Sequence, residues 1–276
     1  AGPSGAGGVD RRAAAGHGGM TLPTAPQADP WAALRRHTPA RIAIGRSGTG
    51  LPTAEVLRLA ADHAAARDAV HLPLDVAALG DALRAQGLQP LPAHSRAATR
   101  EIYLRRPDLG RRLAPQEVPR LQAAATGPVD LAVVLGDGLS AQAVQRHALP
   151  LLLALRAALG DAALRWAPVV VVATQARVAL ADEVGALLQA RVVLMLLGER
   201  PGLSSPDSLG AYLTHAPQVG RTDAERNCVS NIRPEGLAPA RAAHRIAWLL
   251  NEALRRRLSG VALKDDSTST LVGRAD

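Results

Sequence analysis

The sequence predicts an α/β protein in which a doubly wound, mainly parallel, Rossmann-like sheet follows a small helical N-terminal domain. After about residue 126, short apolar runs alternate with segments of helical periodicity, and this alternation is typical of parallel sheets with crossover helices. The apolar runs are continuous, which indicates strands covered by helices on both faces. Before residue 126, Ala- and Leu-rich periodicity predominates and predicts the helical domain.

Residues 1–37 are rich in Gly, Ala and Pro without periodicity, so we expect a disordered leader. The leader has no apolar core of the kind found in signal peptides, which argues against export. Residues 38–125 form the expected helical domain. Thr53, placed just after Pro52, is a favourable N-cap for its first helix. Three helices are expected in this domain, at residues 53–70, 74–86 and 115–125.

Residues 126–260 form the expected α/β domain. Strands are expected at residues 130–136, 168–174 and 191–197. Helices are expected from Ser140, at 151–160, at 180–190 and from Pro239 to Leu258, with a long loop after residue 197. The apolar run Val169–Val172 is too short for a membrane span and is interpreted as a buried strand. Residues 261–276 are expected to form a flexible tail.

Composition and charge exclude several classes of function. The net charge is +8, but Lys264 is the one lysine among 32 cationic residues, and the arginines are spread along the chain. Because no basic run is interleaved with aromatic residues, we expect no nucleic-acid partner. A single cysteine, Cys228, excludes an internal disulfide and a multi-cysteine metal site. The 8 histidines form no metal motif and no serine-hydrolase elbow is present, so a cytoplasmic protein without a metal site is expected.

Polar sequence follows each of the three expected strands, at residues 136–140, 174–178 and 198–205. In a parallel sheet these three strand ends lie at one edge, where open α/β sheets bind ligands. The first of them, GDGLSA, matches G-x-G-x-x-A and could bind a phosphate. No acid follows at the end of the next expected strand, where a dinucleotide-binding fold has one, so we favour a structural turn with Asp137 and Ser140 as caps over NAD binding. A second glycine-rich stretch, 45–50, lacks the Lys-Ser/Thr ending of a phosphate loop and is interpreted as the entry to the first helix.

Two segments after the third expected strand closely resemble the small (light) subunit of ethanolamine ammonia-lyase: GERPGLSSPDSLGAYLTHAP (198–217) and RTDAERNCVSNIRPEGL (221–237). Four others support the resemblance: ARIAIGRSGTGLPT (40–53), ADHAAARDAV (61–70), IYLRRPDLGRRL (102–113) and VVLGDGLSAQAV (133–144). The similarity is collinear with the family over about residues 40–258.

The resemblance implies a subunit of a radical enzyme, inactive alone, that uses adenosylcobalamin to convert ethanolamine to acetaldehyde and ammonia. It implies that a large subunit binds the substrate and holds the catalytic residues, with none in this chain. It also implies that this chain completes the cobalamin cavity through three positions, which the matching motifs place at Val178, Glu199 and Cys228. A corrin needs an apolar wall and a few placed polar groups, and these residue types meet that need.

Several points stay open beside this reading. The chain has no D-x-H-x-x-G motif, so the resemblance implies base-on cobalamin, in which the cofactor keeps its own base. Some relatives enter a bacterial microcompartment, but this leader has no sustained amphipathic periodicity, which argues against encapsulation. The alternatives are a non-catalytic nucleotide-binding Rossmann-like module and an assembly scaffold. The arginines of one run could contact the large subunit or the cofactor, or could form a solvated turn: Arg105, Arg106, Arg111 and Arg112.

Overall fold

The computed structural model describes residues 31–38, 40–160 and 164–267. The chain divides into two compact units, residues 1–45 and 46–276. In the first unit, the described residues contain the short helix α1 (Ala32–Arg35). The expected disordered leader falls mainly on residues 1–30, which lie outside the described residues.

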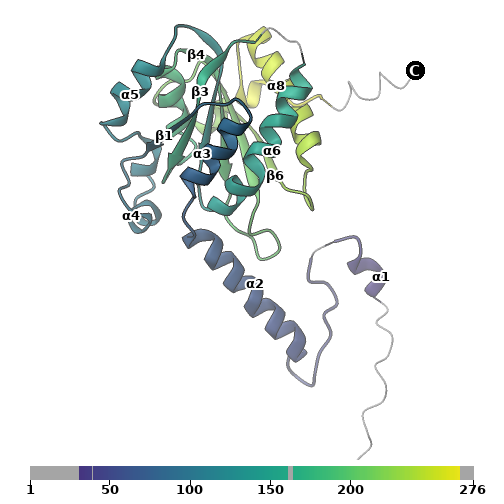
Figure 1. The fold of residues 1–276 in the computed structure, drawn as a ribbon. Helices are drawn as coiled ribbons and strands as arrows, with labels where there is room; N and C mark the ends of the chain where they lie inside the picture. Colours follow the sequence, from purple (N-terminus) through teal and green to yellow (C-terminus); the bar gives the residue numbers. More distant parts are fainter. Residues whose placement is uncertain (1–30, 39, 161–163, 268–276) are drawn as a thin grey trace, which may run out of the picture. The chain divides into compact units, whose positions relative to one another are not determined.

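The second unit is built on a six-stranded mixed sheet with the order β1-β3-β2-β4-β5-β6 (Figure 1). Neighbours among the first four strands are parallel, whereas β5 pairs antiparallel with β4 and β6 antiparallel with β5. The strands are β1 (Pro90–His94), β2 (Val129–Gly136), β3 (Trp166–Thr174), β4 (Ala190–Gly198), β5 (Leu209–His215) and β6 (Arg226–Ile232). The mainly parallel α/β sheet is thus confirmed, but its order is not the 3-2-1-4-5-6 order of a Rossmann fold.

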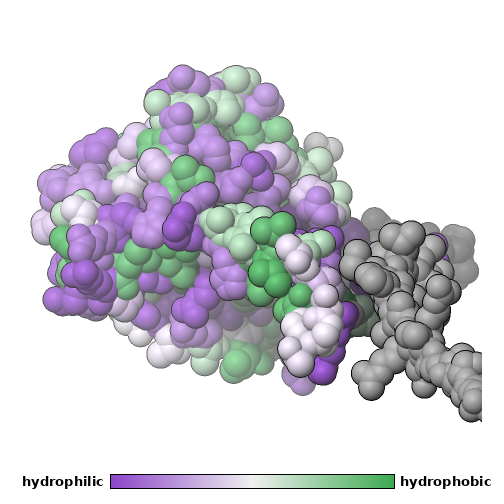
Figure 2. Space-filling view, turned by 90° about the horizontal axis from the view of Figure 1, so that it is seen from below, coloured by the Kyte–Doolittle hydropathy of each residue, from purple (hydrophilic) through white to green (hydrophobic). Residues whose placement is uncertain are grey.

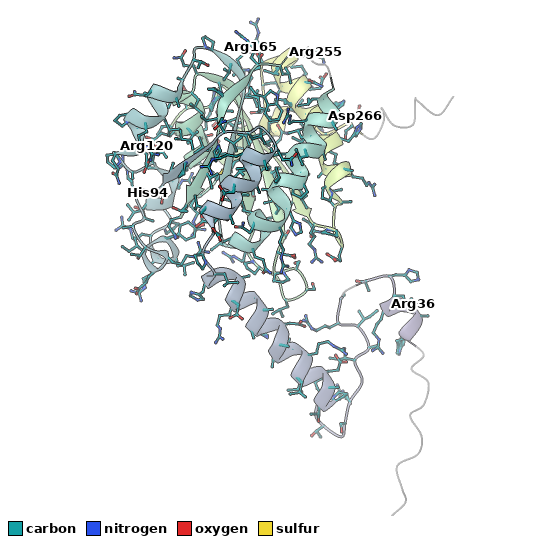
Figure 3. The ribbon with its side chains drawn as sticks, viewed as in Figure 1. Arg36, His94, Arg120, Arg165, Arg255 and Asp266 are labelled. Atoms are coloured by element: carbon teal, nitrogen blue, oxygen red, sulfur yellow. The ribbon has the colours of Figure 1, made fainter. Side chains whose placement is uncertain are left out.

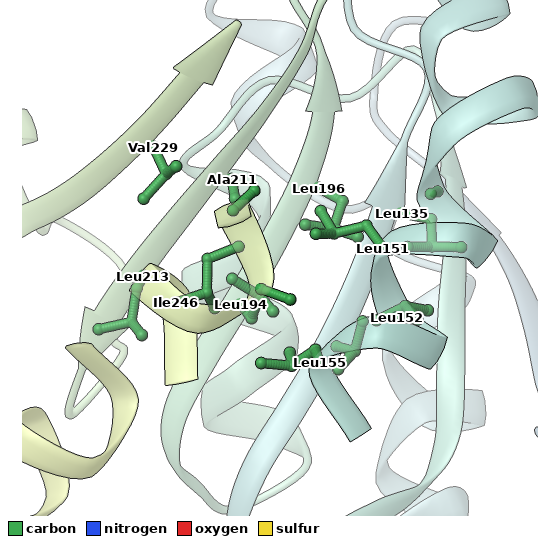
Figure 4. Close-up of a cluster of buried hydrophobic side chains, with 14 of the residues drawn as sticks. Leu135, Leu151, Leu152, Leu155, Leu194, Leu196, Ala211, Leu213, Val229 and Ile246 are labelled. Carbon is green, nitrogen blue, oxygen red and sulfur yellow. The ribbon is translucent and has the colours of Figure 1, made fainter. Parts of the chain in front are cut away.

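Helices cover both faces of this sheet because its central strands are apolar on both sides. Leu131, Val133 and Leu135 of β2 contribute to a core cluster with α3, α6 and α8, part of which Figure 4 shows. Ala132 and Val134 contribute to a second cluster with α5 and α7. The helices are α2 (Thr53–His71), α3 (Val76–Ala85), α4 (Arg100–Arg105), α5 (Glu117–Ala124), α6 (Ala141–Leu159), α7 (Leu180–Leu187) and α8 (Pro239–Arg256). Short 3-10 turns are η1 (Leu109–Arg111), η2 (Asp223–Glu225) and η3 (Gly260–Ala262).

Helix α6 corrects one expectation, because the two helices expected from Ser140 and at 151–160 are one continuous helix. Pro150 lies inside it. A proline removes one helical hydrogen bond and ordinarily kinks or ends a helix. Here the residues on both sides of Pro150 are buried against the sheet, among them Ala148 and Leu151, which are 0% exposed. This packing keeps the chain helical through the proline.

The expectation of a long loop after residue 197 is wrong, because strands β5 and β6 lie in this stretch of the chain. In β6 buried and exposed positions are mixed along a largely polar sequence, so the strand lacks the continuous apolar signal of the central strands. Arg226, the first residue of β6, is anchored by a buried ion pair with Asp182 of α7, with an Nη1–Oδ1 distance of 2.6 Å. Their side chains are 2% and 1% exposed, respectively, so the pair fixes β6 to the helix layer.

The separate helical domain over residues 38–125 is not confirmed. Its expected helices are present as α2, α3 and α5, but it also contains β1, which pairs with β3 and so belongs to the sheet. Of the stretch expected to form a flexible tail, residues 261–267 include Leu263, which is 2% exposed and whose carbonyl accepts a hydrogen bond of 2.7 Å from Asn227 Nδ2. Residues 268–276 lie outside the described residues.

The surface of the molecule is mixed in character. On the face shown in Figure 2, hydrophilic and hydrophobic residues are interspersed. Of the labelled arginines, Arg165 and Arg255 lie near each other at the top of the view in Figure 3, and Arg120 lies apart from them at the left. Within the described ranges, no helix is long and apolar enough to cross a membrane.

Candidate functional site

The loops after β2, β3 and β4 meet at the carboxyl edge of the parallel strands. Helix α6 follows β2 onto one face and α7 follows β3 onto the other, so the chain diverges between these neighbouring strands. Open α/β sheets bind ligands at such a switch point. A pocket of about 550 Å³ lies at this edge, with Leu139, Val178 and Glu199 from the three loops in its lining. This is the edge at which the sequence predicted a site.

The turn after β2 is filled by protein rather than shaped for a phosphate. Asp137 turns its carboxylate inward and accepts hydrogen bonds from the amides of Gln175 and Ala176, at 2.8 and 3.0 Å. Burial raises the pKa of this carboxyl, and the two amide hydrogen bonds oppose the shift. Gly138 packs so closely that a Cβ there would lie 2.1 Å from the carbonyl oxygen of Gly198. Of the two interpretations of GDGLSA, the geometry favours the structural turn.

Ser140 caps α6 as that interpretation expected, since its hydroxyl accepts a hydrogen bond of 3.3 Å from the Ala143 amide. The same hydroxyl donates to the Pro206 carbonyl at 2.8 Å and so ties the loop after β4 to the start of α6. Asp137 differs from the expectation, because it caps the loop after β3 instead of the helix. The loops after β2, β3 and β4 are therefore cross-linked into one support.

The loop after β3 carries Val178 and is held by α4 and the segment that follows it. The Tyr103 hydroxyl donates to the Ala176 carbonyl at 3.1 Å, and the Arg177 guanidinium lies 4.1 Å from the Tyr103 ring centroid. Burial raises the pKa of Tyr103 to about 12, so its hydroxyl stays a donor at neutral pH. Gly110 accepts from the Arg177 amide at 2.8 Å, and a Cβ at Gly110 would lie only 2.9 Å from Arg177 Cγ. Tyr103 and Gly110 thus position the backbone of Val178.

Glu199, in the loop after β4, is held by three donors. The hydroxyls of Ser208 and Ser230 donate to its two carboxylate oxygens at 2.5 Å each, and the Asn231 amide donates at 3.2 Å. Gly210 of β5 makes room for this arrangement, since a Cβ there would lie 2.8 Å from Glu199 Oε1. The carboxylate is therefore oriented by hydroxyl and amide groups, and among the described residues no cation forms an ion pair with it.

Cys228 lies on β6 directly opposite Tyr212 of β5. Tyr212 is part of the pocket lining, whereas Cys228 is an exposed residue beside it. Desolvation raises the pKa of the Cys228 thiol, and the Glu199 carboxylate raises it further. The thiol is therefore protonated at neutral pH, which is a poor state for a nucleophile. The structure thus places Val178 and Glu199 in the pocket and Cys228 next to it.

The arginine run divides into two kinds of residue. Arg111 is part of the pocket lining. The other three pair with acids: Arg105 with Glu101 at 3.0 Å, Arg106 with Asp108 at 2.7 Å and Arg112 with Glu183 at 2.9 Å.

Sequence reasoning missed five residues that build the site: Tyr103, Gly110, Ser208, Tyr212 and Ser230. All five lie inside segments that carried the family resemblance, but nothing in those segments relates Ser230 to Glu199, 31 positions away. The part of the chain that the structure describes holds no group of three His, Cys, Asp or Glu side chains that could bind a metal ion. The site offers an apolar wall, one oriented carboxylate and guanidinium groups, which suits binding rather than acid–base catalysis.

Comparisons with known proteins confirm the resemblance. The family model described as ethanolamine ammonia-lyase light chain (EutC) matches residues 28–264. The ethanolamine ammonia-lyase small subunit of Xanthomonas campestris is 55% identical over 257 residues, which cover 92% of this chain and 94% of the relative. That of Azotobacter vinelandii is 59% identical over 242 residues (87% and 89%), and that of Pseudomonas aeruginosa is 56% identical over 249 residues (89% and 91%). The chain therefore belongs to the ethanolamine ammonia-lyase light-chain family.

Proposed function

We propose that this chain is the small subunit of an adenosylcobalamin-dependent ethanolamine ammonia-lyase and that it forms one wall of the cobalamin cavity. A large subunit supplies the rest of the cavity and the site for ethanolamine. The observation that carries this proposal is the pocket at the carboxyl edge of the sheet, in whose lining Val178 and Glu199 lie together. The family membership supports the reaction and the two-subunit organisation.

The residues of the pocket fit a corrinoid in chemistry. A corrin ring is broad and largely apolar, and it is surrounded by carboxamide groups that donate and accept hydrogen bonds. Leu139, Val178 and Leu197 provide apolar contact area, and Glu199 provides an oriented acceptor for carboxamide N–H groups. When bound, adenosylcobalamin would supply the radical chemistry of the reaction, and the protein would supply position and electrostatics.

Each of the three expected contact residues has a distinct task in this proposal. Val178 packs against the ring, and the loop contacts of Tyr103 hold it in place. Glu199 accepts hydrogen bonds from the carboxamide rim, with its carboxylate oriented by Ser208 and Ser230. Cys228 contacts the cofactor as a small neutral side chain, because its raised pKa keeps the thiol protonated. We propose base-on cobalamin because the chain has no D-x-H-x-x-G motif.

The nucleotide-binding alternative is less well supported. It needs the GDGLSA turn to present free amides to a phosphate. Gly198 occupies that position instead, because its carbonyl oxygen accepts a hydrogen bond of 2.9 Å from the Leu139 amide. A ligand phosphate would have to displace this backbone contact.

Reconstitution with a purified large subunit tests the proposal. We expect ammonia release from ethanolamine only when both chains and adenosylcobalamin are present. In the assembled complex, Glu199→Gln should weaken adenosylcobalamin binding, measured by absorbance titration, because the acceptor loses its charge. The matched control is Glu252→Gln on α8, a half-buried carboxylate that pairs with Arg255 and is not part of the pocket lining, and it should leave the affinity unchanged. Full activity without this chain, or a Glu199→Gln complex of normal affinity, would overturn the proposal and favour the scaffold alternative.

We also propose a cytoplasmic location without encapsulation in a microcompartment, because residues 1–37 show no sustained amphipathic periodicity. A fluorescent fusion of the full chain and one lacking these residues should both be diffuse in cells that make microcompartments. Discrete foci that depend on residues 1–37 would contradict this expectation.

A further inference from the structure

Among the described residues, Arg111 and Arg200 are the two pocket arginines without a hydrogen bond or ion pair, and of these two Arg111 also lines a neighbouring depression. The guanidinium of Arg111 has no hydrogen bond or ion pair with any described residue, although it lies in a pocket lining and is exposed. Its neighbour Arg112 forms two hydrogen bonds with Glu183, at 2.9 and 3.1 Å. Arg177, in the same pocket, donates to the Tyr103 carbonyl at 3.3 Å and stacks on that ring. The protein thus uses these two arginines for its own support and leaves Arg111 available.

The backbone around Arg111 is fixed on both sides. On one side, the Gly110 carbonyl accepts from the Arg177 amide at 2.8 Å, and on the other the Arg112 side chain is held by Glu183. The Arg111 amide itself donates to the Asp108 carbonyl at 3.2 Å within η1. A cation on such an anchored backbone loses less conformational freedom on binding than one on a mobile loop.

Arg111 also lies where two depressions meet. The pocket of about 550 Å³ shares Arg111, Ala179 and Asp223 with a second depression of about 450 Å³. The second depression extends to Gly220 and Arg221, away from Glu199. The acids of this region are engaged: Asp108 pairs with Arg106, and Asp223 lies 3.4 Å from Arg226. Arg221 pairs with Glu225. The shared boundary of the two depressions therefore presents a cation without a protein counter-ion.

A ligand of two parts would fit this arrangement, with a broad amphipathic part at Val178 and Glu199 and an anionic part at Arg111. Cobalamin has these two parts, because its nucleotide loop leaves the corrin ring and carries a phosphodiester, which is a permanent anion. An arginine fork binds a phosphate through two parallel charge-assisted hydrogen bonds. Resting on the proposed function, we propose that Arg111 binds the phosphodiester of the cofactor's nucleotide loop and so directs that loop into the second depression.

The test measures binding to the assembled two-subunit enzyme, without substrate and without turnover. Absorbance titration gives the dissociation constants of adenosylcobalamin and of adenosylcobinamide, which has the same corrin but no nucleotide loop or phosphate. Arg111→Gln should weaken adenosylcobalamin binding about tenfold, as expected for loss of a charge-assisted contact, and leave adenosylcobinamide binding unchanged. Arg111→Lys, which keeps the charge without the fork, should lie between. The matched control is Arg105→Gln, from the same run but paired with Glu101, which should change neither constant.

Three results would overturn the assignment. Unchanged adenosylcobalamin affinity would remove Arg111 from the site, and equal losses for both ligands would place it on the corrin instead of the phosphate. A loss of subunit association by Arg111→Gln in cofactor-free protein, seen by size-exclusion chromatography, would assign it to an acidic group of the large subunit. If the wild-type complex binds adenosylcobinamide too weakly to titrate, the salt dependence of adenosylcobalamin binding decides, since Arg111→Gln should reduce it and an unchanged dependence would refute the contact.

The failure of this assignment is distinguishable from failure of the proposed function. If the wild-type complex binds adenosylcobalamin and Glu199→Gln weakens it while Arg111→Gln does not, only the phosphate contact is refuted. If the wild-type complex binds no adenosylcobalamin, the proposed function itself fails.

Discussion

Replacing Gly198 with alanine would place a methyl group where the end of β4 meets the turn after β2. The new Cβ would lie 2.0 Å from the Ser140 carbonyl oxygen and 2.5 Å from that of Asp137. Ordinary contact begins near 3.4 Å, so the turn would have to retreat by 3.4 − 2.0, or about 1.4 Å. Both contacts are with backbone, which cannot rotate away as a side chain can. The substitution therefore separates β4 from the loop that supports the site.

The cost has two parts. Overpacking costs typically about 1–3 kcal/mol, and the hydrogen bond from the Leu139 amide to Gly198 contributes about 1 kcal/mol. We expect the free energy of unfolding to fall by about 2–4 kcal/mol, and the melting temperature by roughly 5–15 °C. Urea and thermal unfolding followed by circular dichroism measure both quantities.

Gly80→Ala is the matched control, because it makes the same chemical change inside α3. Its Cβ would lie 3.5 Å from the nearest atom, Pro90 Cγ, which is ordinary contact. Alanine also has the higher helix propensity, so this variant should gain about 0.5–1 kcal/mol. A Gly198→Ala protein that unfolds within about 0.5 kcal/mol of wild type would refute the argument, since that is the size of a neutral surface change.

Three further predictions concern the anchor of β6 and the groups around Glu199. Arg226→Met leaves Asp182 buried without its cation and should lower the free energy of unfolding, measured in urea, by about 3–5 kcal/mol. Replacing both partners by apolar residues should restore most of this stability. Equal losses of stability in the two variants would contradict the prediction. The raised pKa of Cys228 predicts that iodoacetamide reacts with this thiol more slowly at pH 7.5 than with a free thiol. The pH midpoint of the reaction should be lower in Glu199→Gln, because the carboxylate that raises the pKa is gone. An unchanged midpoint would show that desolvation alone sets the shift. Ser230→Ala removes a hydroxyl donor that orients Glu199 and should weaken adenosylcobalamin binding by about threefold to tenfold. Ser230→Thr keeps a hydroxyl and should restore the affinity. If the threonine variant binds as weakly as the alanine variant, loss of the hydroxyl does not explain the weaker binding.

The central part of the fold was predictable because its strands are short, apolar on both faces and separated by regular helices. The missed elements lack such a signal. Strand β1 contains Pro90 and Pro92, which argue against a strand in any position except an edge, and β1 is an edge strand. Strand β6 is largely polar, and the pairing of β5 with its neighbours holds it in place. Two helices were expected where α6 runs unbroken through Pro150, because the buried leucines around the proline outweigh its local penalty.

The site was predictable to the level of its edge and no further. The ends of the expected strands and the glycines after them predicted where the loops lie. The resemblance to the family then indicated Val178 and Glu199 within these loops. The residues that orient these two come from distant parts of the chain: Tyr103 contacts the loop of Ala176 across 73 positions and Ser230 contacts Glu199 across 31. No periodicity or motif links residues so far apart, because the contacts arise from the order of strands in the sheet.

The two outer edges of the sheet have a consequence for how a partner chain can approach. At the two ends of β1, the Ser95 amide donates to the Thr174 carbonyl and the Gln89 carbonyl accepts from the Val170 amide. The odd-numbered positions therefore bond to β3, and the backbone groups of the even-numbered positions face outward. Two of these outward positions are Pro90 and Pro92, which have no N–H. Along β6, the Asn227 side chain bonds to Gly260 and Leu263, and the Asn231 carbonyl accepts from the Leu237 amide. Both margins thus oppose β-augmentation, through two missing donors on β1 and through contacts of Asn227 and Asn231 on β6 with the chain's own later segments. These edges favour contact with a partner chain through side chains and loops over extension of the sheet by a partner's strand.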